Sequence, residues 1–136
     1  MISKFPICKG TAIGCAFAFF LFLFSCQTDS AVNYEELLLG KWQATALTEQ
    51  DSLMDIDLRS VQLDFQLGNR YNYRGTLKEV EAGSYRVQKD LLFTKDTIVK
   101  PPQEKVVKIL KLTIDSLQIE MLDKDKRRVL DLRKKR

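Results

Sequence analysis

The stretch VQLDFQLGN, residues 61–69, carries the clearest structural signal in this chain of 136 residues. Apolar and polar side chains alternate from Val61 to Leu67, which is typical of a β-strand with one buried and one solvated face. Gly68-Asn69 follows and predicts a tight two-residue hairpin turn. The alternation resumes over residues 71–77, with Tyr71 and Tyr73 on the predicted buried face, so the two runs form a β-hairpin.

The same period of two recurs on both sides of this hairpin. Upstream it begins at Trp42, with Ala44 and Ala46 on the apolar side. Downstream, turn-forming residues separate further short runs at 83–87, 91–97, 105–112, 117–121 and 127–133. Closing such a meander removes its exposed edges. We therefore expect an all-β protein built as a small eight-stranded antiparallel up-and-down barrel, whose interior is filled or holds one small ligand.

A short helix is expected just before the first strand. Asn33 is a suitable N-cap, Glu35 and Glu36 would lie in the first turn, and Gly40 can end the helix.

The amino-terminal segment has a different character from the rest of the chain. Lys4 and Lys9 precede residues 12–24, an almost unbroken apolar run. A basic start followed by a short apolar run is typical of a secretory signal peptide. The run is shorter than the roughly 20 residues that a membrane-spanning helix needs. The alternative is an uncleaved hydrophobic helix.

The end of this run is similar to a known processing site. Leu23-Phe24-Ser25-Cys26 resembles the lipobox of bacterial lipoproteins. The resemblance implies a diacylglycerol thioether on the Cys26 sulfur, cleavage before Cys26 and an acylated new amino terminus. Several acyl chains anchor a protein stably where one chain is marginal. The chain would then comprise a signal peptide (1–25), a tether (26–33) and a barrel domain (34–136), anchored in a bacterial cell envelope and facing the periplasm or the surface.

Two further stretches resemble the lipocalin family. Leu39-Gly40-Lys41-Trp42 resembles the G-x-W motif that leads into the first lipocalin strand, and residues 83–92 are similar to the middle of bacterial lipocalin-like lipoproteins. In lipocalins the motif tryptophan closes one end of the barrel, and an arginine of the last strand packs on it. The resemblance implies this role for Trp42, with either Arg128 or Arg133 as its partner. A guanidinium group over an indole contributes about 0.5–2 kcal/mol.

The composition excludes several kinds of active site. The chain has no histidine, and its cysteines are Cys8, Cys15 and Cys26. Ser-His and Cys-His nucleophile pairs are therefore excluded, and zinc loses its two main ligand types. The acidic residues Glu49, Asp51, Asp55 and Asp57 lack the glycine-bearing loop of a calcium site, so we interpret them as a solvated loop. We expect a protein that is not an enzyme and that binds neither a metal nor a cofactor.

The carboxyl-terminal segment is basic and admits three interpretations. Its basic residues are Lys124, Lys126, Arg127, Arg128, Arg133, Lys134, Lys135 and Arg136. Nucleic acid is not an expected partner, because Asp123, Asp125 and Asp131 interrupt the run and the chain is expected to be exported. Anionic lipid headgroups would contribute about 1 kcal/mol per basic residue near a membrane. A solvated strand end is the interpretation we favour.

The inward-facing aromatic side chains suggest the function. The residues that would line a ligand site are Trp42, Phe65, Tyr71, Tyr73, Tyr85, Phe93 and Met121. The same alternation also fits a filled barrel, in which these side chains form the core. Our leading hypothesis is a membrane-anchored lipoprotein that binds a small hydrophobic or amphipathic ligand. The alternative is a non-enzymatic structural or adaptor lipoprotein with a filled barrel and a protein partner, which the sequence does not identify.

Overall fold

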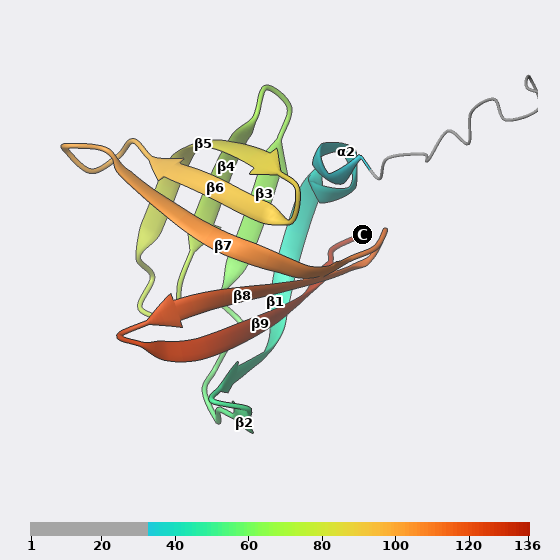
Figure 1. The fold of residues 1–136 in the computed structure, drawn as a ribbon, viewed down its shortest axis with the longest axis vertical. Helices are drawn as coiled ribbons and strands as arrows, with labels where there is room; N and C mark the ends of the chain where they lie inside the picture. The colour runs from blue at the N-terminus through green and yellow to red at the C-terminus, as the bar shows by residue number, and fades with distance from the viewer. Residues whose placement is uncertain (1–32) are drawn as a thin grey trace, which may run out of the picture. The chain divides into compact units, whose positions relative to one another are not determined.

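The computed structural model describes residues 33–136, and the predicted signal peptide and Cys26 lie outside this range. The described chain consists of one short helix followed by nine strands (Figure 1). The elements are α2 (Tyr34–Leu38), β1 (Gly40–Glu49), β2 (Ser52–Leu53), β3 (Gln62–Gln66), β4 (Arg70–Arg74), β5 (Val80–Gln88), β6 (Leu91–Asp96), β7 (Gln103–Leu112), β8 (Ser116–Asp123) and β9 (Lys126–Lys134).

The sheet is an antiparallel meander that closes on itself. The strands are ordered β2-β1-β3-β4-β5-β6-β7-β8-β9, and β1 also pairs with β9. Closure through β1 and β9 leaves the two-residue β2 as an appendage on the end of β1. The remaining eight strands form the barrel, so the predicted eight-stranded antiparallel architecture is confirmed.

The short helix forms where it was expected but ends differently. The Asn33 side chain accepts a hydrogen bond from the Glu36 amide at 3.3 Å, which caps the first turn. Glu35 and Glu36 lie in that turn. The helix ends at Leu38 with Leu39 as its C-cap, so Gly40 does not terminate it. Gly40 instead begins β1 with φ at +123°, a conformation that glycine adopts without steric cost.

The β3–β4 hairpin is confirmed, but its details differ from the prediction. Because Gln66 is the Cα partner of Arg70, the loop has three residues rather than two. Both Gly68 (φ +81°) and Asn69 (φ +57°) have left-handed backbones, as a tight turn requires. β4 ends at Arg74, and Leu77 is 87% exposed in the turn that follows, so it does not continue the buried face.

A β-bulge in β1 corrects the predicted alternation of that strand. Ala44 pairs with Leu132, but the register shifts before Ala46, which pairs with Asp131. The extra residue moves the following side chains to the opposite face. Leu47, opposite Leu130, therefore packs against the core in place of Ala46.

One apolar core fills the barrel next to the helix. Its fully buried large side chains are Trp42, Tyr71, Phe65, Leu38, Leu92, Leu117 and Leu132. We call the end of the barrel that carries α2 the closed end. The loops at 50–61, 75–79, 97–102 and 124–125 lie at the opposite end, which we call the mouth (Figure 1).

Candidate functional site

The closed end is built around Trp42. This side chain is fully buried, and its Nε1 donates a hydrogen bond to the Leu38 carbonyl oxygen at 2.8 Å. The Nζ of Lys134 lies 4.9 Å from the centroid of the Trp42 ring and donates to the Leu37 carbonyl oxygen at 3.0 Å. Tryptophan and lysine thereby bind the last carbonyls of α2, which have no partner within the helix. The arrangement fixes the helix over this end of the barrel.

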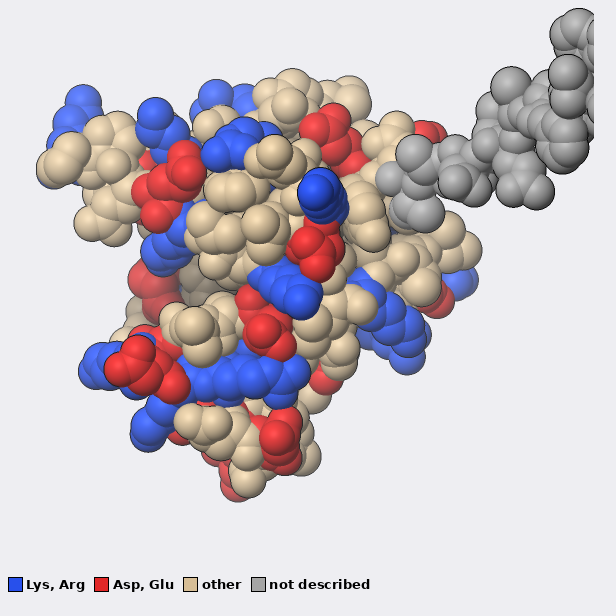
Figure 2. All heavy atoms as spheres, viewed as in Figure 1, with Lys and Arg blue, Asp and Glu red and all other residues tan. Residues whose placement is uncertain are grey.

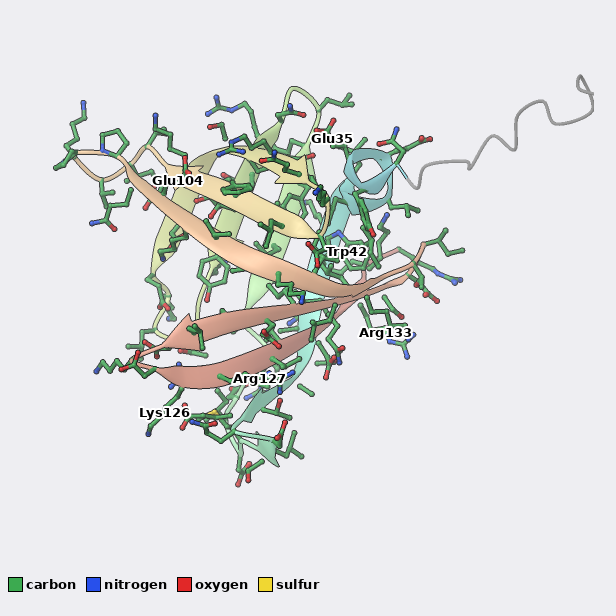
Figure 3. All side chains as sticks on the ribbon, viewed as in Figure 1. Glu35, Trp42, Glu104, Lys126, Arg127 and Arg133 are labelled. Atoms are coloured by element: carbon green, nitrogen blue, oxygen red, sulfur yellow. The ribbon has the colours of Figure 1, made fainter. Side chains whose placement is uncertain are left out.

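The partner of Trp42 is therefore Lys134 and not an arginine, and the expectation for Arg128 and Arg133 was wrong. Lys134 is the Cα partner of Trp42 across β1 and β9. Arg133 is two-thirds exposed and lies 3.9 Å from Asp115. Arg128 lies toward the mouth, where it is the Cα partner of Glu49. Figure 3 shows Trp42 and Arg133 toward the α2 end and Arg127 near the other end of β9. Only the strand register, which the sequence does not reveal, selects Lys134.

Removing the Lys134 ammonium group is expected to weaken the closed end modestly. Lys134→Met keeps the aliphatic stem but loses the cation over Trp42 and the hydrogen bond to Leu37. We expect the free energy of unfolding to fall by about 0.5–1.5 kcal/mol in urea titrations. Lys134→Arg should retain most of that stability. A Lys134→Met variant as stable as the parent would contradict this role.

The aromatic residues predicted to line a ligand site fall into different environments. Phe65, Tyr71 and Tyr85 are buried in the core, and the rings of Phe65 and Tyr85 pack edge to face with centroids 4.9 Å apart. They fill the barrel together with Trp42. Tyr73 and Met121 are only partly buried and pack against the core from the mouth side. Of the predicted lining residues that face the interior, these two have the exposure that a bound molecule could cover.

Phe93 does not line the interior, and its prediction is corrected. Its neighbour Leu92 occupies the core, so Phe93 points to the outer face of β6. The guanidinium carbon of Arg86, its Cα partner on β5, lies 3.8 Å from the centroid of its ring. The run 91–97 contains apolar residues at successive positions, and this is why alternation alone assigned the wrong face.

Two groups of charged side chains line the mouth. On one wall, Lys105 of β7 forms an ion pair with Glu81 of β5, and the Tyr71 hydroxyl donates to Glu81 at 3.3 Å. On the other wall, Arg128 contacts Glu49 and Asp123, each at 2.7 Å. Hydrogen bonding from Arg128 lowers the pKa of Glu49. Glu81 was not among the predicted lining residues, although it has the same strand parity as Tyr85.

Burial of the Tyr71 ring changes the pH at which the Tyr71 hydroxyl group loses its proton. Desolvation raises the pKa of Tyr71 to about 12. The ordinary pKa of a tyrosine is about 10. The folding stability that depends on neutral Tyr71 is therefore fully present below pH 10 and is lost as the pH rises toward 12. We expect the free energy of unfolding to fall by up to roughly 2–3 kcal/mol over this window. In Tyr71→Phe the fall should be smaller, and one late step should vanish from the ultraviolet titration of tyrosine. Identical alkaline titrations for the two proteins would contradict this prediction.

The comparisons with known proteins bear on the fold. No family model matches the chain, and no curated protein sequence matches it. A crystal structure of a lipocalin-like protein from Bacteroides uniformis is similar, with a TM-score of 0.55 and 21% sequence identity. The match covers 73% of this chain and 99% of that one. The described chain has a lipocalin-like fold. At this identity the likeness concerns the fold alone.

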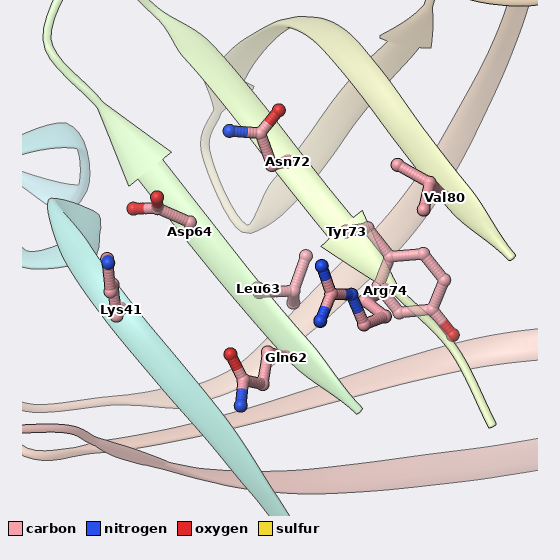
Figure 4. A pocket seen from close by; sticks show the side chains of 8 residues that line it. All are labelled: Lys41, Gln62, Leu63, Asp64, Asn72, Tyr73, Arg74 and Val80. Carbon is pink, nitrogen blue, oxygen red and sulfur yellow. The ribbon is translucent and has the colours of Figure 1, made fainter. Parts of the chain in front are cut away.

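The outer wall of the lipocalin-like barrel also carries shallow hollows. One of about 370 Å³ lies over β3 and β4 (Figure 4). Its lining is mixed, with polar groups from Lys41, Gln62, Asp64, Asn72 and Arg74 and apolar groups from Leu63, Tyr73 and Val80. A second, of about 280 Å³, lies over β8 and β9 near Gln118 and Asp131. Both hollows present polar and charged groups on the outer face of the barrel.

The basic residues near the carboxyl end of the lipocalin-like barrel do not form one basic surface. Arg127 pairs with Glu120 at 2.7 Å and with Asp51 at 2.9 Å. Arg128 and Lys126 both contact Glu49. Figure 2 shows basic and acidic residues interspersed over the face in view. This mixing is typical of a solvated protein surface.

Residues 33–136 present neither a cluster of metal-ligating side chains nor a membrane-spanning helix. Among these residues no group of three or more acidic or cysteine side chains is placed to hold a metal ion. No helix within the same range has the length and apolar character needed to span a bilayer.

Proposed function

We propose that this protein is a non-catalytic, lipid-anchored lipoprotein of the bacterial cell envelope, whose lipocalin-like barrel binds a single-chain amphiphile at its mouth. The observation that carries the proposal is the combination of groups there. Tyr73, Val107 and Met121 pack against the core but stay partly exposed. Charged groups on the two walls lie beside them. An amphiphile matches this combination, because it has an alkyl chain to cover and a polar head to solvate.

The filled core limits what the barrel can hold. Trp42, Phe65 and Tyr71 are at most 2% exposed, so a ligand has no room beside them at the closed end. Protein interiors are close-packed, and inserting further groups among such side chains strains them. A ligand would therefore contact only the mouth half. This favours a short or partly inserted alkyl chain over a bulky, fully enclosed ligand.

The proposed anchor is consistent with the position of the described amino terminus. Asn33 caps α2, which lies at the closed end. The tether (26–33) has seven residues after Cys26, which span at most about 25 Å when fully extended. A chain acylated at Cys26 would hold the closed end near its membrane.

Acylation is tested by metabolic labelling. In a bacterial expression host supplied with a fatty-acid probe, the parent chain should incorporate the label and fractionate with membranes. Cys26→Ala should lose the label, because the sulfur that accepts the diacylglycerol is gone. Cys15→Ala serves as the matched control and should behave like the parent. Equal labelling of Cys26→Ala and the parent would contradict the anchor.

Ligand binding is tested with twelve-carbon amphiphiles that share a chain and differ in the head group. Dodecanoate, dodecylphosphocholine and dodecyl maltoside would compete with dansyl-undecanoate for the parent protein. We expect displacement by at least one of them. Met121→Gln should weaken binding about tenfold, because it places an amide where an alkyl chain would lie. Ile114→Gln is the control, since Ile114 is 75% exposed at the closed end. A parent that binds no probe would overturn the ligand proposal.

The second candidate function is that of an adaptor, and the outer hollow over β3 and β4 favours it. Asp64 and Asn72 project there from paired positions on the two strands. A protein partner seated on this face should be recovered by cross-linking from envelope preparations of the native cell. Asp64→Ala with Asn72→Ala should reduce that recovery without changing amphiphile binding. Recovery unaffected by these substitutions would exclude this face.

A further inference from the structure

The barrel wall is split on one side, between β7 and β8. These strands pair only from Lys108 and Glu120 toward the closed end. β7 nevertheless begins five residues earlier, at Gln103, and β8 continues to Asp123. Their other neighbours stay paired over these same residues, β6 with β7 and β8 with β9. Figure 1 shows β7 and β8 diverging toward the mouth. We call this divergence the seam.

The two sides of the seam are apolar where they separate. Continuing the register of Lys108 and Glu120 would place Val106 opposite Leu122. Val106 is 50% exposed and Leu122 is 75% exposed, although each lies within a strand. On the inner side, Val107 and Met121 pack against the core. Apolar side chains therefore lie on both the outer and the inner side of the strand ends that border the seam.

Ion pairs link each side of the seam to its own neighbouring strands. On β7, Glu104 contacts Arg86, Lys105 contacts Glu81 and Lys108 contacts Asp90, and all these partners lie on β5 or beside β6. On β8, Glu120 contacts Arg127, and Asp123 contacts Arg128, both on β9. Among the described residues, no recorded ion pair joins β7 to β8 across the seam.

We propose that the seam is a side entrance, through which the alkyl chain of an amphiphile passes between Val106 and Leu122 to reach Val107 and Met121. The inference rests on the proposed ligand function and adds the route. The polar head would remain outside, beside Lys108 of β7 and Glu120 of β8, which lie on the outer side of the wall where the seam begins. Entry through the seam lets the alkyl chain reach the interior while the polar head stays in water. An alkyl chain that entered through the mouth would have to pass between the two charged walls.

The backbone at the seam favours an alkyl chain over an added peptide strand. The Ile109 amide donates to the Asp90 carbonyl oxygen at 2.7 Å, so alternation along β7 directs the backbone groups of Glu104 and Val106 toward β8. On β8, the backbone amide and carbonyl groups of Leu122 point toward β7 by the same alternation. A peptide strand gains its affinity from a run of main-chain hydrogen bonds. These few positions offer too short a run, whereas the apolar sides suit an alkyl chain.

A reversible cross-link tests the route. Cys8, Cys15 and Cys26 would be replaced by serine in the full chain, and Val106→Cys with Leu122→Cys would then close the seam on oxidation. We expect the association rate of dansyl-undecanoate to fall at least about tenfold and to recover on reduction. The control is Ser84→Cys with Lys95→Cys, exposed Cα partners across β5 and β6 that are already paired and lie away from the seam. Its cross-link should leave the rate unchanged.

A second variant keeps the test decisive if the two thiols do not join. Val106→Asn with Leu122→Asn removes the apolar sides of the seam at exposed positions, and association should again slow about tenfold. A cross-linked protein or an Asn variant that binds as fast as the cysteine-free parent would overturn the side entrance and leave the ligand proposal standing. A cysteine-free parent that binds no probe would overturn the ligand proposal and the entrance with it.

Discussion

Trp42→Ala is expected to lower the free energy of unfolding by about 3–5 kcal/mol, as large aromatic-to-alanine changes in packed cores do. Trp42 is fully buried, and its hydrogen bond to the Leu38 carbonyl oxygen connects the closed end of the barrel to α2. Its loss leaves a cavity, an unpaired carbonyl group and a Lys134 cation without its ring. Small domains are stabilised by only about 5–15 kcal/mol in total. Urea unfolding followed by far-ultraviolet circular dichroism measures the change.

Two further variants separate packing from hydrogen bonding at this site. Trp42→Phe keeps an apolar ring but cannot donate to Leu38, so it should cost clearly less than the alanine variant. Leu77→Ala is the surface control, because Leu77 is 87% exposed, and its effect should stay within about 0.5 kcal/mol. A Trp42→Ala protein within 1 kcal/mol of the parent would show that the closed end does not depend on this residue.

The barrel could be predicted from the sequence because its main signal is local. The alternation of Leu63 and Phe65 with polar neighbours fixes which face of β3 is buried, and no distant residue is needed to interpret it. The same holds for Tyr71 and Tyr85, both of which lie in the core. Closure followed from a general argument about exposed edges rather than from any single residue.

The errors arose where distant residues decide the outcome. The β1 bulge depends on pairing with β9, and it exchanges Ala46 for Leu47 at the core face. The choice of Lys134 beside Trp42 depends on the same register. The seam depends on the alignment of four strands, β6 to β9. The ion pair between Glu81 and Lys105 is a further example, because it joins two strands that are not neighbours in the sheet. The charge pattern along either strand alone does not indicate it.

The second large effect is expected at Gly83, in the middle of β5. Gly83 is buried, and it is the Cα partner of Tyr71 on one side and of Asp96 on the other. A Cβ atom at this position would overlap the backbone carbonyl group of Lys95 and crowd the Thr97 amide. Neither backbone group can move without disturbing the β5–β6 ladder. Gly83→Ala should therefore lower the free energy of unfolding by about 2–4 kcal/mol.

Gly75→Ala is the matched control for this prediction. It also introduces a Cβ atom at a buried glycine, but the atoms that it would meet belong to the Glu79 carboxylate. That group sits at the end of a flexible side chain and can rotate away, losing its 2.8 Å hydrogen bond from the Leu77 amide. We expect a cost of about 1 kcal/mol. At position 83 the backbone must move to admit the Cβ atom, whereas at position 75 only a side chain must move. Equal losses of unfolding free energy in urea would therefore refute the close approach of β5 to β6 as the reason for glycine at position 83.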